Sequence, residues 1–171
     1  MTREIRSVTL LPPCTRRYRV VISEEVREEL GRAKSFHPET LLRGITVLRN
    51  THPAREHLLT YLSNRYPYLH TGELSSFLLA VTVFSAEGQR CFFVTDDGRM
   101  RRSLPKLLED SELKGALGVR ALSLEHTGTI GLILRLAETG SITPEERLLV
   151  CSDLRKSSFR CSKDILNRLA N

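Results

Sequence analysis

Short runs of apolar, mostly β-branched residues alternate along this chain with longer stretches in which apolar residues recur at helical spacing. The short runs predict strands, because branched side chains pack well on a pleated surface, and the longer stretches predict amphipathic helices. The predicted strands are residues 5–11, 18–22, 91–94 and 119–122. The predicted helices are residues 24–31, 53–66, 71–81, 98–108 and 130–137, with two more beginning at 144 and 162.

Several of these helices begin with residues that can satisfy free backbone N–H groups. Ser23 and Thr71 stand at N-cap positions, and Thr143 followed three residues later by Glu146 has the pattern of a capping box. Strands separated by helices favour parallel pairing, because a parallel crossover needs about a dozen residues or more. We therefore expect one α/β domain over residues 1–171.

Length and composition agree with a single folded domain. A chain of 171 residues with 40% hydrophobic and 27% charged residues excludes collagen-like and disordered classes. The net charge is +6, and 21 of the 26 basic residues are arginine, whose planar guanidinium suits phosphate oxygens. Nucleic acid is therefore one interpretation of the charge, and a basic surface without a partner is the other. Residues 1–20 alone contribute +4 of this charge.

The cysteines and the apolar runs bear on the compartment. The four cysteines have neither C-x-x-C pairing nor zinc-finger spacing, so we expect free thiols. No apolar run approaches the roughly 18 residues of a membrane span, and the basic N-terminus lacks a signal-peptide core. The sequence therefore predicts a cytoplasmic protein with no membrane partner.

Carboxylates gather at two places that an α/β fold can bring together. Asp96 and Asp97 follow a predicted strand and precede a helix, and ligands bind beyond the carboxyl ends of parallel strands. Glu73 lies in the first turn of another helix, at the rim of an apolar stripe that includes Phe77. If that helix crosses the sheet, Glu73 and Asp97 converge, and converging carboxylates suit Mg²⁺ or Mn²⁺. The alternative is that these acids only cap helices.

Other sites are less favoured by the sequence. His70 precedes Glu73 closely but reads as a loop histidine, and Ser75 and Ser76 lie outside any nucleophile elbow. A phosphate-binding G-x-x-x-x-G-K-[ST] loop does not occur. These observations argue against a serine hydrolase and against the usual nucleotide hydrolases.

Several runs of the sequence resemble the PIN domain, a nuclease fold. They are TDDGRMRR at 95–102, HTGELSSFLLA at 70–80 and YRVVISEEVREEL at 18–30. TGTIGLILRLAETGSIT and FRCSKDILNRLA, further along the chain, are similar to one prokaryotic branch of that family. The resemblance spans about residues 18–170. It implies a three-layer α/β sandwich with a central, mostly parallel sheet.

The resemblance also implies an activity and its residues. A PIN domain of this kind cleaves RNA with Mg²⁺ or Mn²⁺, and the toxin of a toxin–antitoxin pair is one such role. The family's helix carboxylate falls on Glu73 and its Thr-x-Asp carboxylate on Asp97, which would be the metal ligands. Asp96 would assist catalysis or cap a helix. The arginines that follow would hold the RNA backbone or form a solvated helix face; they are Arg99, Arg101 and Arg102.

The chain departs from the family pattern at its start. The family's first strand ends in a metal-binding Asp, whereas no Asp precedes Asp96 here. Either part of the N-terminal strand–helix unit is missing or the first acid has been lost. A second hypothesis is therefore a catalytically degenerate PIN-like module that binds RNA or a protein partner. An antitoxin and a second copy of the chain are the protein partners that we consider.

Overall fold

The computed structural model of the chain describes residues 11–32, 44–85, 90–156, 164 and 167. The chain forms two compact units, each made of segments that are separate in sequence. The first unit is Met1–Val20, Ala33–Thr46 and Ile130–Asn171, and the second is Val21–Arg32 and Val47–Thr129. No helix in the described ranges is both long and apolar enough to cross a membrane.

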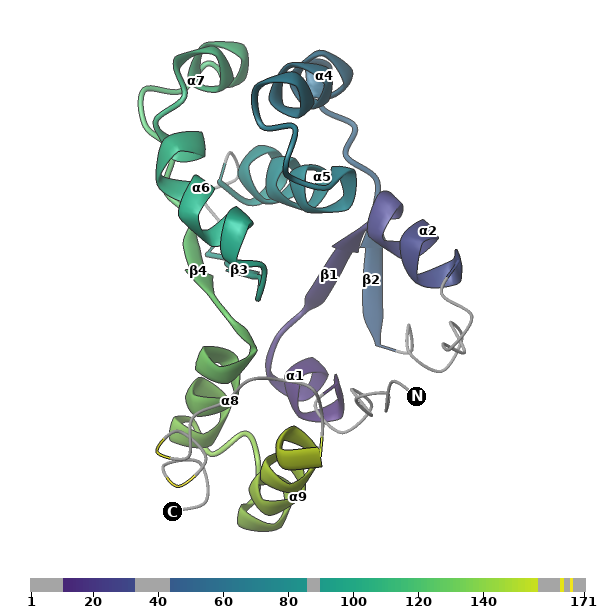
Figure 1. Cartoon of the computed structure of the whole chain (residues 1–171), viewed down its shortest axis with the longest axis vertical. Helices are drawn as coiled ribbons and strands as arrows, with labels where there is room; N and C mark the ends of the chain where they lie inside the picture. The colour runs from purple at the N-terminus through teal and green to yellow at the C-terminus, as the bar shows by residue number, and fades with distance from the viewer. Residues whose placement is uncertain (1–10, 33–43, 86–89, 157–163, 165–166, 168–171) are drawn as a thin grey trace. The chain divides into compact units, whose positions relative to one another are not determined.

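Helices and short strands alternate along the described residues (Figure 1). The elements are α1 (Leu11–Arg17), β1 (Val20–Ser23), α2 (Glu24–Arg32), β2 (Ile45–Leu48), α4 (Arg55–Arg65), α5 (Thr71–Leu79), the π-helix η2 (Ala80–Ser85), β3 (Phe92–Val94), α6 (Gly98–Leu108), α7 (Ser111–Leu117), β4 (Glu125–Thr127), α8 (Thr129–Glu138) and α9 (Pro144–Lys156). β1 pairs with β2, and β3 pairs with β4 in parallel. The predicted α/β class is confirmed, with small sheets.

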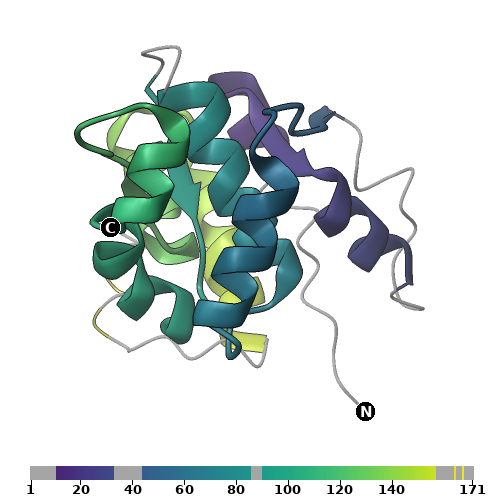
Figure 2. The ribbon, with the colours of Figure 1, turned by 90° about the horizontal axis from the view of Figure 1, so that it is seen from above.

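The second unit is organised around a core of leucines and aromatic side chains. Phe77 on α5 is fully buried, and its ring meets the ring of Phe93 on β3 edge to face at 6.4 Å between centroids. α4 and α5 lie side by side in both views (Figures 1 and 2). Leu58 and Leu62 of α4 fill the same core as Leu104 of α6. Apolar residues at helical spacing on each helix therefore supply the faces that enclose β3.

A buried carboxylate joins two helices of the same unit. Asp110 caps α7 by accepting a hydrogen bond from the backbone N–H of Leu113 at 3.0 Å. Its other oxygen accepts from the Tyr61 hydroxyl of α4 at 3.1 Å and lies 3.3 Å from the Arg65 guanidinium. These bonds satisfy a charge that would otherwise be costly to bury.

The first unit has its own core and its own polar network. Ile133 and Leu136 of α8 pack with Cys151 and Leu154 of α9. The predicted capping box is confirmed, because the backbone N–H of Glu146 donates to the Thr143 hydroxyl at 3.2 Å and the Glu146 carboxylate accepts from the Thr143 N–H at 2.8 Å. The side chain of Arg16 on α1 pairs with the Glu146 carboxylate at 2.8 Å, which links α1 to the start of α9.

Some predicted elements differ from the observed ones. The strand predicted at 119–122 is wrong, since the strand of this region is β4, three residues later. Leu11, assigned to the end of a strand, begins helix α1, and the rest of that predicted strand lies outside the described residues. The predicted helix from 162 lies almost entirely outside them as well. The N-cap of α5 is His70 rather than Thr71, which is the first helical residue.

Candidate functional site

The carboxyl ends of β3 and β4 meet at one edge, and the acidic residues follow directly. Val94 pairs with Thr127, and the Thr95 N–H continues the ladder by donating to the Thr127 carbonyl at 2.9 Å. Beyond this point β3 leads through Asp96 and Asp97 into α6, while β4 leads into α8. This is the edge at which open α/β sheets bind ligands.

Asp97 caps helix α6 with one carboxylate oxygen. Its Oδ1 accepts hydrogen bonds from the backbone N–H groups of Arg99 at 2.6 Å and of Met100 at 2.8 Å. The Met100 bond is the main reason that the pKa of Asp97 lies below its usual value, and the Arg99 N–H, the Arg99 guanidinium and the His70 ring add to it. Asp97 is therefore ionised at neutral pH, and within the described residues its Oδ2 accepts no hydrogen bond.

Asp96, the neighbouring residue, caps a different helix. Its Oδ1 accepts from the backbone N–H of Thr129 at 2.9 Å and its Oδ2 accepts from the Thr129 hydroxyl. Gly128 makes this approach feasible, because a Cβ there would lie 2.6 Å from Asp96 Oδ1. Both Asp96 oxygens are thus occupied at the start of α8, whereas Asp97 keeps one oxygen available.

Glu73 lies in the first turn of α5 and reaches back to the N-cap, whereas Asp97 is itself the N-cap of α6. Its Oε2 accepts a hydrogen bond from the backbone N–H of His70 at 3.1 Å. The side chain is half-buried, and its Oε1 has no hydrogen-bond partner among the described residues. Glu73 therefore also combines a structural bond on one oxygen with an available second oxygen.

Contacts of individual residues connect the start of α6 with the start of α5. The His70 ring at the N-cap of α5 is close enough to Asp97 to lower the pKa of that carboxyl. The Arg99 guanidinium of α6 reaches back to the Tyr68 carbonyl, just before α5, at 3.4 Å. These contacts connect residues at the two helix termini, and the convergence of Glu73 and Asp97 themselves stays a prediction.

The donor set at these termini fits a weakly held divalent cation. Two carboxylate oxygens are available, and Mg²⁺ is often bound by one or two carboxylates with water completing its shell. Among the described residues there is no group of three or more histidine, cysteine, aspartate or glutamate side chains placed to hold a metal. Any ion bound here would therefore rest on Glu73 and Asp97.

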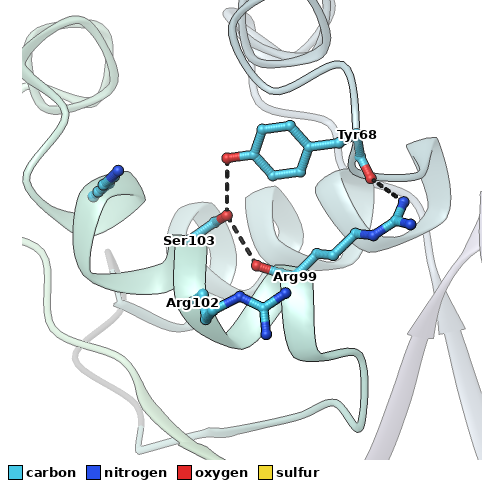
Figure 3. Close-up of a pocket in the computed structure, with 5 residues that line it drawn as sticks. Tyr68, Arg99, Arg102 and Ser103 are labelled. Atoms are coloured by element: carbon cyan, nitrogen blue, oxygen red, sulfur yellow. Dashed lines mark hydrogen bonds between the residues drawn. The ribbon is translucent and has the colours of Figure 1, made fainter.

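The arginines of α6 divide between two sides of the helix. Arg99 and Arg102 line a pocket of about 430 Å³ together with Tyr68, Ser103 and Lys106 (Figure 3). Arg101 is exposed but does not line this pocket. The three arginines that the sequence predicts for RNA binding are therefore not equivalent.

A half-buried carboxylate on α2 supports the helix that carries Glu73. Glu25 accepts a hydrogen bond from the Ser75 hydroxyl of α5 and pairs with the Arg55 guanidinium of α4. Burial tends to raise the pKa of Glu25, but the Ser75 hydrogen bond and the Arg55 charge outweigh it and the pKa lies below its usual value. Glu25 thus joins three helices in its ionised form.

This lowered pKa predicts an acid-sensitive link. The native state keeps the Glu25 charge at pH values where the unfolded chain binds a proton, so the stabilisation is complete above the ordinary glutamate pKa, about 4.3. It is lost as the pH falls through the native value. Urea unfolding between neutral and acidic pH should therefore show a smaller loss of stability for Glu25→Gln than for the wild type. Glu28 is exposed on the same helix, and Glu28→Gln should lose as much stability between neutral and acidic pH as the wild type. An equal loss of stability for Glu25→Gln and Glu28→Gln would contradict the role of Glu25.

Sequence reasoning missed several residues around this site. Thr129, the partner of Asp96, lies 33 positions away, and no local pattern connects the two. Tyr68 lies in a loop between two helices, where its exposure and pocket position depend on packing. The Glu25–Ser75 pair also joins distant positions. Gly128 was the nearest available signal, since a glycine before a helix often permits a close approach.

A family model for a PIN domain, DUF3368, matches residues 3–171. Among curated proteins and solved structures, none matches the chain. PIN domains have a nuclease-type fold and generally use divalent metals. Because the family match extends over nearly all of the sequence, the chain belongs to the PIN-domain family.

Proposed function

We propose that this protein is a metal-dependent ribonuclease of the PIN-domain type, with Glu73 and Asp97 as the residues that hold Mg²⁺ or Mn²⁺. The observation that carries the proposal is that each of these carboxylates uses one oxygen to cap its helix and leaves the other available, at neighbouring helix termini. When bound, a divalent cation supplies Lewis-acid stabilisation of charge on a phosphoryl oxygen.

The chain's own residues then have distinct tasks. Asp97 and Glu73 bind the cation with oxygens whose direction is fixed by the caps of α6 and α5. Asp96 caps the start of α8 through Thr129. Arg99 brings a positive charge next to Asp97, where it favours the ionised carboxylate and can bind an RNA phosphate.

Cleavage of a labelled RNA in Mn²⁺ or Mg²⁺, followed by chelation and metal restoration, tests the proposal. We expect cleavage to stop on chelation and to return with the metal. Glu73→Gln keeps an oxygen that can accept from the His70 N–H, so this variant should fold normally and bind Mn²⁺ at least about tenfold more weakly in calorimetry. Equal Mn²⁺ affinity for wild type and Glu73→Gln would contradict the metal assignment.

One observation favours a second function, a PIN-like module without catalysis that binds RNA or a protein partner. Asp96, Asp97 and Glu73 each make a helix-capping hydrogen bond, which is by itself a sufficient structural reason for their presence. This function predicts RNA binding that falls steeply with salt and does not respond to metal. Metal-dependent turnover of RNA would exclude it.

A toxin role is a further part of the proposal. If the chain acts as the toxin of a toxin–antitoxin pair, its expression should arrest growth, and a co-expressed antitoxin should relieve the arrest and form a complex with it. Growth arrest by a cleavage-deficient variant would contradict this role, because the arrest would then not depend on RNA cleavage. Sedimentation of the purified chain would show whether it also forms a homodimer.

A further inference from the structure

The pocket beside α6 combines three cations with an exposed aromatic ring. Arg99, Arg102 and Lys106 follow one another at positions i, i+3 and i+7, so they share one stripe of the helix and border the pocket. Along the axis they are about 5 and 6 Å apart, at 1.5 Å per residue. No carboxylate among the described residues pairs with any of them. The stripe is thus a row of positive charge without ion pairs, and Arg99, at its start, lies near the Asp97 carboxylate.

Tyr68 forms the opposite wall and is held in place by three contacts. The residue is 45% exposed, and the edge-to-face contact of its ring with Tyr66 has a centroid distance of 6.2 Å. Its hydroxyl lies 3.2 Å from the Ser103 hydroxyl, which in turn donates to the Arg99 carbonyl at 2.9 Å (Figure 3). The Tyr68 carbonyl accepts from the Arg99 guanidinium. The ring is therefore oriented before any ligand arrives.

From this arrangement we infer that the pocket lined by Tyr68, Arg99, Arg102, Ser103 and Lys106 binds single-stranded RNA, with an unpaired base stacked on Tyr68 and the phosphate backbone running along the cations of α6. The inference rests on the proposed function for its choice of RNA, and it adds the form of the substrate and the way in which it is held.

Three features favour this ligand. A base must be unpaired and unstacked to lie on an aromatic side chain, so an exposed tyrosine ring selects single strands over duplex. A row of arginine and lysine side chains attracts consecutive phosphates of any sequence. The pocket volume of about 430 Å³ lies within the range of roughly 300–1,000 Å³ for ligand sites, which gives room for one base with its sugar.

The position of the pocket also connects it to the candidate metal site. Arg99 borders the pocket and lies two residues after Asp97 on the first turn of α6. A strand that follows the cations from Lys106 toward Arg99 therefore arrives at the carboxylates of the candidate site. Tyr68, which contacts Ser103 and Arg99 along this path, lies two residues before His70, the N-cap of α5.

Arg101 and Arg102 provide a matched pair of variants for the test. Both are exposed arginines of α6, each replacement by alanine removes one charge, and only Arg102 lines the pocket. Binding of a fluorescent single-stranded RNA is measured by anisotropy in chelator, so that no cleavage occurs. We expect Arg102→Ala to weaken binding about fivefold and to make the log–log salt dependence shallower by about 0.7, the value for one phosphate contact on a single strand. Arg101→Ala should stay within about twofold of the wild type on this basis.

Tyr68 is tested in the same assay by a second pair. Tyr68→Phe keeps the ring and loses the hydroxyl, whereas Tyr68→Leu removes the ring. We expect Tyr68→Leu to weaken binding about tenfold, since stacking of a base on an aromatic ring supports an effect of this size. Tyr68→Phe should bind as the wild type does, and circular dichroism melting of each variant controls for folding.

Several results would overturn the inference. Equal loss for Arg101→Ala and Arg102→Ala would show a general basic surface, and unchanged binding by Tyr68→Leu would remove the stacking contact. If duplex RNA competes as strongly as single-stranded RNA does, the pocket does not select single strands. If polyglutamate competes as strongly, the pocket binds acidic polymers in general. The proposed function and the binding pocket can fail separately. If RNA binds with these variant effects but is not cleaved in the presence of metal, only the proposed ribonuclease activity is refuted.

If RNA is cleaved in a metal-dependent way and Arg102→Ala and Tyr68→Leu leave the KM unaltered, only the proposed RNA-binding pocket is refuted.

Discussion

Replacement of Asp97 by asparagine is expected to reduce metal-dependent RNA cleavage by at least about 100-fold, because loss of a metal-binding carboxylate removes several kcal/mol of transition-state stabilisation. Asparagine keeps an oxygen that can accept from the N–H groups of Arg99 and Met100, and it is as good an N-cap as aspartate. The free energy of unfolding should therefore change little. Cleavage rate at saturating Mn²⁺, Mn²⁺ affinity and urea unfolding measure the three quantities.

Two further variants distinguish the charge of Asp97 from its helix-capping role, and the effect of Asp97 on activity from that of Asp96. Asp97→Ala removes both functions, so it should lose activity and also about 1 kcal/mol of stability. Asp96→Asn changes the adjacent carboxylate, whose two oxygens already bond Thr129, and should retain most of the activity. If Asp96→Asn loses as much activity as Asp97→Asn, then Asp96 has the catalytic part that the sequence allows for it, and the assignment of Asp97 alone is wrong.

Elements with a local signal are the ones that the sequence predicts well. Helix α6 begins and ends at the predicted residues, because Asp97 is an effective cap and the apolar positions repeat at helical spacing. The capping box of α9 is likewise a local pattern. The sequence does not predict β2 or α7. β2 has four half-buried residues, and they form a strand only because they pair with β1. α7 is short, and its capping aspartate also bonds residues of a distant helix. β4 consists of Glu125, His126 and Thr127, which carry no apolar signal, whereas the neighbouring residues 119–122 include Val119 and Leu122 and so favour a strand there.

The residues of the candidate site also divide into those with a local sequence signal and those whose roles depend on distant contacts. The sequence indicates that Glu73 and Asp97 lie at helix termini, because capping residues are recognisable from their neighbours. It does not indicate which carboxylate oxygen is engaged, because Thr129 reaches Asp96 only through the parallel pairing of β3 with β4. Nor does it distinguish Arg101 from Arg102, since both are exposed on one helix and only the position of the Tyr68 loop gives one of them a pocket.

An aromatic contact in the core joins the helix that carries Glu73 to the strand that leads to Asp97. Phe77 lies one turn after Glu73 on α5, and Phe93 precedes Asp97 by four residues on β3. Their rings pack edge to face, with an interplanar angle of 83°. Since edge-to-face aromatic pairs have a preferred geometry, we expect this contact to contribute to the orientation of α5 against β3, together with the rest of the core. Core packing is therefore expected to influence the geometry of the candidate site.

Phe77→Ala is therefore expected to lower the free energy of unfolding by about 3–5 kcal/mol, the loss typical of truncating a fully buried phenylalanine. Domains of this size are stable by about 5–15 kcal/mol, so the variant should be partly unfolded at elevated temperature. Phe77→Leu fills most of the volume and should cost less than about 2 kcal/mol, yet it removes the ring contact with Phe93. In the folded Phe77→Leu protein we expect weaker Mn²⁺ binding and slower cleavage, because α5 can shift relative to β3.

Leu113→Met is the control, because Leu113 is equally buried but lies on α7 away from this contact. This variant should leave Mn²⁺ affinity unaltered. Unaltered Mn²⁺ affinity in Phe77→Leu, measured by calorimetry on the folded protein, would show that the aromatic pair stabilises the core without setting the geometry of the carboxylates.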